Sequence, residues 1–128
     1  MSETRHVLTI LAVDDVARAA AFYVAAFGWT RTVEVPVYVE LALPGGMRLG
    51  VYERHGYGAN TGRAPIRIDP GEIGPTELYL RTDDLDGAVA RAMDAGARML
   101  SPCAMRAWGD DVAYLADLDG NVIALARA

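Results

Sequence analysis

The sequence predicts an α+β protein made of two βαβββ modules, each one small sheet with a helix on one face. The first observation is an internal repeat: an apolar strand-like run, an Asp-Asp pair, a helix-forming segment and a glycine occur in this order twice. The second is a segment between the copies, residues 54–75, that is dense in glycine and proline. Because a repeat indicates one structural unit used twice, we expect a single domain over residues 1–128. Module one then covers 5–53, a linker 54–75, and module two 76–128.

Module one begins with the run VLTILAV, residues 7–13, which is short and apolar enough for a buried strand. Asp14 or Asp15 is suited to cap the next segment, VARAAAFYVAAF, whose apolar residues recur at helical spacing. Gly28 is then the expected helix end. Three further strands are expected at 29–35, 38–43 and 47–53, with a Pro-Gly-Gly turn between the last two.

Module two repeats the order, with a strand at 77–82, a cap at Asp83-Asp84 and a helix that ends at Gly96. Strands are expected at 97–100, 112–116 and 121–125. The Asp-rich stretch at 117–121 lacks the spacing and closing glutamate of a calcium loop, so we interpret it as a turn. Residues 54–75 show no period and are expected to form a linker or mobile loop.

Composition excludes several classes of protein. The formal net charge of -5 disfavours binding to nucleic acid or to anionic membranes, because both surfaces repel it. No apolar run approaches the length of a membrane span, and no signal core precedes residue 7, so a cytoplasmic location is expected. The single cysteine, Cys103, allows no internal disulfide and is expected to be a buried or half-buried thiol without nucleophilic activation.

Three segments resemble the glyoxalase/bleomycin resistance/dioxygenase (vicinal oxygen chelate) superfamily: LTILAVDDVARAAAFYVAAFGW, LYLRTDDLDGAVARAMDAGA and WGDDVAYLADLDGNVIALA. The resemblance covers nearly the whole chain apart from residues 54–75. It implies that the modules form a paired, partly open barrel around a ligand cavity, and that the chain forms a homodimer. The family includes lyases, dioxygenases, epimerases, thiol transferases and drug-binding proteins, so the resemblance specifies the fold more than the activity.

In metal-dependent members of that family, four side chains from the first and last strands of the two modules hold a divalent ion. They are usually histidine or glutamate. The resemblance places these positions at Leu8, Gly50, Glu77 and Ala124. Because one carboxylate cannot supply the three or four protein ligands of a metal centre, we expect no metal and no cofactor. Gly50 and Ala124 are also expected to leave room for a larger guest.

The predicted site is therefore a ligand pocket with apolar walls and one carboxylate anchor, Glu77. Tyr52 and Tyr79 share strand parity with Gly50 and Glu77, and Trp108 lies on a loop where its ring could stack on a planar guest. The predicted ligand-binding residues are Leu8, Tyr38, Gly50, Tyr52, Glu77, Tyr79, Trp108, Tyr114 and Ala124.

The leading hypothesis is a metal-free protein that sequesters an aromatic or amphipathic small molecule, such as an antibiotic or a metabolite. The alternative is a glyoxalase-like lyase, isomerase or dioxygenase with a non-standard metal site, for which His6, Glu40 and His55 could join Glu77. A third reading makes Glu77 a lone general base in an epimerase or isomerase. A regulatory protein that binds a partner and no small ligand stays open as well.

Overall fold

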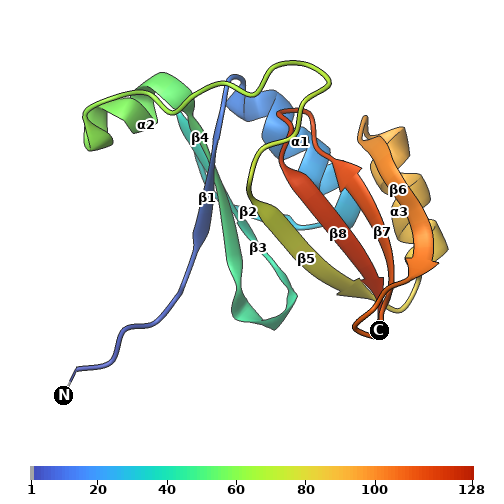
Figure 1. Ribbon diagram of the computed structural model, residues 1–128. Helices are drawn as coiled ribbons and strands as arrows, with labels where there is room; N and C mark the ends of the chain where they lie inside the picture. Colours follow the sequence, from blue (N-terminus) through green and yellow to red (C-terminus); the bar gives the residue numbers. More distant parts are fainter. Residues whose placement is uncertain (1) are drawn as a thin grey trace. The chain divides into compact units, whose positions relative to one another are not determined.

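The computed structural model describes residues 2–128, which divide into two compact units. Unit 1 runs as far as Ile66, and unit 2 begins at Arg67 and also includes Ala25–Gly28. Each unit contains one four-stranded sheet (Figure 1). Both sheets mix parallel and antiparallel pairs and neither closes on itself. The α+β class and the two βαβββ modules are thus confirmed.

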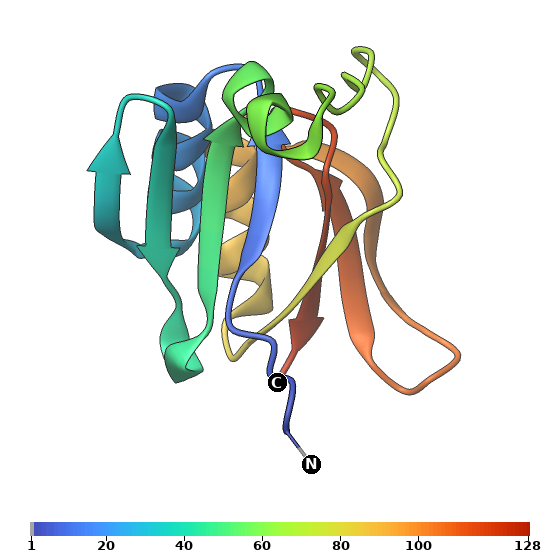
Figure 2. The same cartoon turned by 90° about the vertical axis from the view of Figure 1, so that its left-hand side faces the viewer.

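Unit 1 has the strand order β1-β4-β3-β2, in which only β1 and β4 run parallel. Figure 2 shows α1 behind this sheet and α2 at the end of β4. Asp15 caps α1, since its Oδ1 accepts a hydrogen bond of 3.0 Å from the backbone N–H of Arg18. The elements are β1 (Thr9–Val13), α1 (Val16–Phe27), β2 (Thr30–Val35), β3 (Tyr38–Ala42), the 3-10 turn η1 (Pro44–Gly46), β4 (Arg48–Glu53) and α2 (Arg54–Thr61).

The two faces of the unit 1 sheet differ in chemistry. Its core face, toward α1, carries a set of buried apolar side chains: Leu11, Val13, Val39, Leu41, Leu49 and Val51. The register places Gly50 between Ile10 of β1 and Glu40 of β3. Because neighbouring residues on a strand point to opposite faces, Glu40 and Gly50 share the other face with Tyr38 and Tyr52. We call this surface the Tyr38 face.

Unit 2 repeats the arrangement, with the strand order β5-β8-β7-β6 and a parallel β5–β8 pair. Asp84 caps α3 through a 3.2 Å hydrogen bond from the N–H of Gly87, as the Asp-Asp repeat predicts. The turn at Asp117 is confirmed, because its carboxylate accepts from the backbone N–H groups of Asp119 and Asn121. The elements are β5 (Glu77–Thr82), α3 (Leu85–Asp94), β6 (Arg98–Met105), β7 (Asp111–Ala116) and β8 (Val122–Arg127).

The prediction that all of 54–75 is irregular is wrong, because its first eight residues form α2. The carboxylate of Glu53 caps this helix, accepting from the N–H groups of His55 at 2.6 Å and Gly56 at 3.1 Å. Glycine at position 58 serves packing as well: a Cβ there would lie 2.6 Å from the backbone nitrogen of Ala64. The glycines of this segment suggest a loop, but Gly58 is needed because the chain folds back against the short helix at this point.

Two further expectations need correction. The strand expected at 97–100 is longer, since β6 continues to Met105. Two register shifts against β7 interrupt the alternation that marks a strand, so the sequence pattern does not reveal the second half of β6. Cys103 lies on this part of β6 and is exposed, not buried. In the described part of the chain, residues 2–128, no helix is both long and apolar enough to cross a membrane.

Candidate functional site

In unit 1, the two positions that the family resemblance assigns to chelating residues are Leu8, just before β1, and Gly50 in the middle of β4. Gly50 is not open space. A Cβ built there would lie 2.5 Å from the Tyr38 hydroxyl and 2.7 Å from its Cε1, so the Tyr38 ring already covers this position. The expectation that Gly50 leaves room for a guest is therefore wrong within this unit, because a neighbouring side chain fills the volume that a chelating residue would take.

Tyr38 is held over Gly50 by a carboxylate that sequence reasoning treats only as a stray metal donor. Glu40 is 8% exposed, and its two oxygens accept hydrogen bonds from the Tyr38 hydroxyl at 2.7 Å and from Arg48 Nη1 at 3.0 Å. Burial, together with the bond to Glu40, raises the pKa of the Tyr38 phenol. The phenol therefore stays protonated and donates to Glu40 throughout the physiological range.

The Tyr38 face continues into a row of aromatic rings. The rings of Tyr38 and Tyr52 are 5.4 Å apart and those of Tyr52 and Tyr57 are 5.6 Å apart, both edge-to-face. The structure thus brings together three predicted residues, Tyr38, Gly50 and Tyr52. The strand register explains why the two rings meet, since Tyr38 and Tyr52 are cross-strand partners.

A cavity of about 590 Å³ lies at one end of the Tyr38 face and includes the predicted residue Leu8. Its polar groups are the side chains of His6, Glu40 and Arg48. His6 Nε2 lies 3.0 Å from the Thr9 hydroxyl, while Glu40 is already bonded to Tyr38 and Arg48. The lining residues are His6, Val7, Leu8, Glu40, Gly45, Gly46, Met47 and Arg48.

Two side chains of metal-ligating type, His6 and Glu40, line this cavity. Within residues 2–128, no group of three or more histidine, cysteine, aspartate or glutamate side chains is placed to hold an ion. His55, a further donor considered for a non-standard site, lies on α2, where its Nε2 is 3.5 Å from Arg54 Nη2. One histidine and one carboxylate in this cavity are fewer donors than the three or four protein ligands of a catalytic metal centre.

In unit 2, the register places Ala124 of β8 between Tyr79 of β5 and Tyr114 of β7. We call this surface, with Glu77 on it, the Tyr79 face. Ala124 is fully buried and forms an apolar cluster with Val112 and Ala126, against which Tyr114 packs. The structure thus brings together Tyr79, Tyr114 and Ala124, as the sequence predicts.

The Arg106 guanidinium packs over the ring of Tyr114. Its guanidinium carbon lies 5.0 Å from the centre of the Tyr114 ring, a cation–π distance. The same guanidinium donates to the carbonyl of Val112 at 2.8 Å and to the Ser101 hydroxyl at 3.1 Å. Sequence reasoning does not identify Arg106, because it lies outside the strand periods and on the turn that follows β6.

The exposed rim of the Tyr79 face is a connected cluster of four side chains. Trp108 Nε1 donates to the Tyr79 hydroxyl at 2.9 Å, and that hydroxyl donates to Asp110 Oδ2 at 2.5 Å. Arg81 donates to the same oxygen at 3.1 Å, and its guanidinium lies 5.6 Å from the Tyr79 ring centre. Trp108 is nevertheless 58% exposed, so most of its ring surface is available for contact.

Two pKa shifts follow from this cluster. The Arg81 guanidinium, and then the Tyr79 hydroxyl, lower the pKa of Asp110 by stabilising its charged form. The bond to Asp110 in turn raises the pKa of Tyr79. Glu77, the predicted anchor, lies at the start of β5 and is exposed, so water solvates its carboxylate.

Comparison with known proteins identifies the family. Residues 8–126 match the glyoxalase-like domain family, so this chain belongs to that family. No curated protein sequence gives a significant match. The family and fold support a protein of the vicinal oxygen chelate superfamily that binds small molecules.

Several solved structures share the fold. A glyoxalase-related enzyme from Fulvimarina pelagi is 21% identical, with a TM-score of 0.86, over 98% of this chain and 89% of that one. A glyoxalase/bleomycin resistance protein/dioxygenase family enzyme from Burkholderia phytofirmans is 20% identical, with a TM-score of 0.74, over 94% and 95%. Protein ATC0852 from Agrobacterium tumefaciens is 26% identical, with a TM-score of 0.76, over 97% and 98%.

Proposed function

We propose that this protein binds and sequesters an aromatic or amphipathic small molecule without using a metal. The proposal is supported by the apolar and aromatic side chains found at the positions that the family resemblance assigns to chelating residues. Tyr38 covers Gly50, and Ala124 lies in an apolar cluster flanked by Tyr79 and Tyr114. Apolar surface with a few fixed polar groups is the usual lining of a small-molecule site.

The Tyr79 face supplies the contacts for a planar guest. The Trp108 ring is exposed and its orientation is fixed by the bond to Tyr79, so little side-chain entropy is lost on stacking. Stacking contributes about 0.5–1.5 kcal/mol beyond the burial of area. Arg81 and Glu77, on the same strand face, offer one charge of each sign to the polar groups of the guest.

The proposal is tested by isothermal titration against a panel of planar antibiotics and aromatic metabolites, with and without EDTA. We expect at least one compound to bind with a Kd below about 1 mM, and EDTA to leave that affinity unchanged. Trp108→Ala should weaken binding about tenfold, whereas Trp108→Phe, which retains an aromatic face, should weaken it less. A panel with no binder in this range counts against the proposal.

The metal-dependent alternative gives a different result. Protein purified without chelator is analysed for nickel, zinc, manganese and iron, and the measurement is repeated on Glu77→Ala. We expect metal far below one equivalent in both proteins, because the donor set does not fit an ion. Near-stoichiometric metal that disappears in Glu77→Ala would overturn metal independence and favour a lyase or dioxygenase.

The family resemblance also suggests a homodimer, which we include in the proposal. Light scattering coupled to size-exclusion chromatography tests it. A mass near 27 kDa, twice the 13.7 kDa of one chain, supports the dimer. A mass near that of one chain contradicts it.

A further inference from the structure

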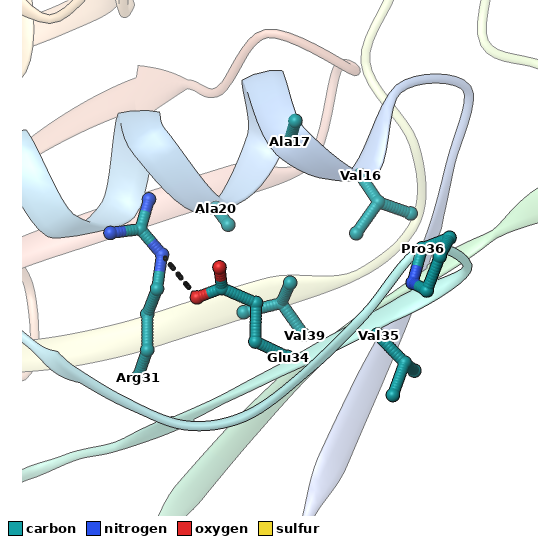
Figure 3. Close-up of a pocket in the computed structure, with 8 residues that line it drawn as sticks. All are labelled: Val16, Ala17, Ala20, Arg31, Glu34, Val35, Pro36 and Val39. Carbon is teal, nitrogen blue, oxygen red and sulfur yellow. Dashed lines mark ion pairs between the residues drawn. The ribbon is translucent and has the colours of Figure 1, made fainter.

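A second cavity lies on the core side of the unit 1 sheet, between α1 and the strands β2 and β3 (Figure 3). It has a volume of about 370 Å³. It is separate from the Tyr38 face: Val39 lines it, whereas the neighbours of Val39 on β3, Tyr38 and Glu40, point to the opposite side of the sheet. The lining residues are Val16, Ala17, Ala20, Arg31, Glu34, Val35, Pro36 and Val39.

The floor of this cavity is apolar. Val16, Ala20 and Val39 are all less than one tenth exposed, and Ala17 lies beside them at the exposed surface of α1. Small side chains on α1 leave the space that larger ones would fill. The volume lies within the range of small-molecule pockets, so a short aliphatic chain fits against this floor.

Two opposite charges lie at the mouth. Arg31 and Glu34 reach from β2 toward α1, with Arg31 Nε 3.5 Å from Glu34 Oε2. Residues three apart on a regular strand point to opposite faces. Here a bulge between Arg31 and Val33 shifts the register, so that Arg31 pairs with Leu41 and Glu34 with Val39, both on the core face. Bulges of this kind re-aim side chains beside functional sites.

The ion pair itself contributes little to stability. The two side chains are 40% and 66% exposed, and such surface pairs are weak because water screens them. The pair can therefore separate to accept two ligand charges at small cost. A ligand with a carboxylate alone would meet the like charge of Glu34, and a ligand with an ammonium alone would meet that of Arg31. Only a ligand that carries both charges next to each other pairs with Arg31 and Glu34 at the same time.

We propose that this cleft binds a free aliphatic α-amino acid. Its carboxylate bonds to Arg31, its ammonium bonds to Glu34, and its side chain packs against Val16, Ala20 and Val39. The site is independent of the aromatic site proposed above, because its lining shares no residue with the Tyr38 face or with the Tyr79 face. It would give the protein a second ligand of metabolic origin.

Three probes of one carbon skeleton test the charge requirement by NMR titration of 15N-labelled protein. Leucine carries both charges, leucinamide lacks the carboxylate, and 4-methylpentanoate lacks the ammonium. We expect leucine to bind at least about fivefold more tightly than either analogue, with shifts at Ala17, Ala20 and Glu34. Arg31→Gln should abolish the preference over leucinamide, and Glu34→Gln the preference over 4-methylpentanoate.

A blocking variant tests the location. Ala17→Leu places a larger side chain at the mouth, and the exposed helical position tolerates leucine. Ala25→Leu is the matched control, exposed on the same helix about two turns further on. We expect Ala17→Leu to weaken leucine binding at least about tenfold and Ala25→Leu to leave it unchanged.

Several results would overturn the proposal. These are no saturable leucine binding up to about 10 mM, equal affinity for leucine and 4-methylpentanoate, or an equal effect of the two leucine variants. Trp108→Ala separates this site from the aromatic one, because it should leave leucine binding unchanged. Failure of leucine to bind therefore does not bear on the proposed aromatic ligand, and the reverse also holds.

Discussion

Gly50→Ala tests whether the Tyr38 ring fills the space beside Gly50, the position that the family resemblance assigns to a chelating residue of unit 1. The new Cβ would lie 2.5 Å from the Tyr38 hydroxyl and 2.9 Å from Cζ, so the ring must move. If the ring stays and strains, overpacking costs about 1–3 kcal/mol. If it swings out, its 2.7 Å bond to the Glu40 carboxylate is lost, at a cost of about 1.5–3 kcal/mol. Reduced freedom of the unfolded chain offsets about 0.4–1 kcal/mol of either cost.

We therefore expect Gly50→Ala to lower the free energy of unfolding by about 1–2 kcal/mol, measured by urea titration with circular dichroism. In a Tyr38→Ala background the clash is absent, so Gly50→Ala should be neutral or slightly stabilising. The double-mutant cycle should then give a coupling of at least about 1 kcal/mol. If the two backgrounds agree within about 0.5 kcal/mol, the ring does not occupy this position and the reasoning fails.

Three other predictions concern unit 2 and α2. The difference in free energy of unfolding between wild type and Asp110→Asn, measured by urea titration, should narrow as pH falls from about 5 toward 2. The reason is that the pKa of Asp110 is lowered in the folded protein, so its stabilising charge is lost only in acid. A difference that stays constant with pH contradicts this. Glu53→Ala should speed hydrogen exchange at the amides of His55 and Gly56 in mass spectrometry while β4 keeps its protection. Ala124→Glu should destabilise by about 3 kcal/mol or more in thermal unfolding, because it buries a carboxylate without a partner; a cost below about 1 kcal/mol would mean that the site is open.

The repeat predicts the fold well because both modules use the same local signals. Asp15 and Asp84 accept hydrogen bonds from the first turns of their helices, so each Asp-Asp pair marks a helix start for a physical reason. Prediction fails where tertiary contact outweighs local pattern. The glycine at position 58 indicates a loop by composition, yet it is needed because the backbone of Ala64 lies against it.

Strand parity predicts part of the site, and side-chain reach explains what it misses. Parity places Tyr52 on the same face as Gly50 and Tyr79 on the same face as Glu77, and the register agrees. Parity cannot show how far a ring extends along the sheet, so the cover that Tyr38 forms over Gly50 is not visible in the sequence. The same holds for Arg106, which reaches the carbonyl of Val112 from a turn.

Gly50 and Ala124, which the family resemblance assigns to chelating positions, are covered by different means in the two modules. Glu40 is the cross-strand partner of Gly50, and Tyr114 that of Ala124, so the registers of the two sheets correspond. In unit 1 an aromatic ring lies over a glycine, held by Glu40. In unit 2 the equivalent residue is an alanine that packs into an apolar cluster. A chelating side chain at position 50 would need Tyr38 to move first, and one at position 124 would need a polar partner for a buried charge. Metal binding at these two positions would therefore need coupled changes in each sheet, which supports the proposed metal-free function.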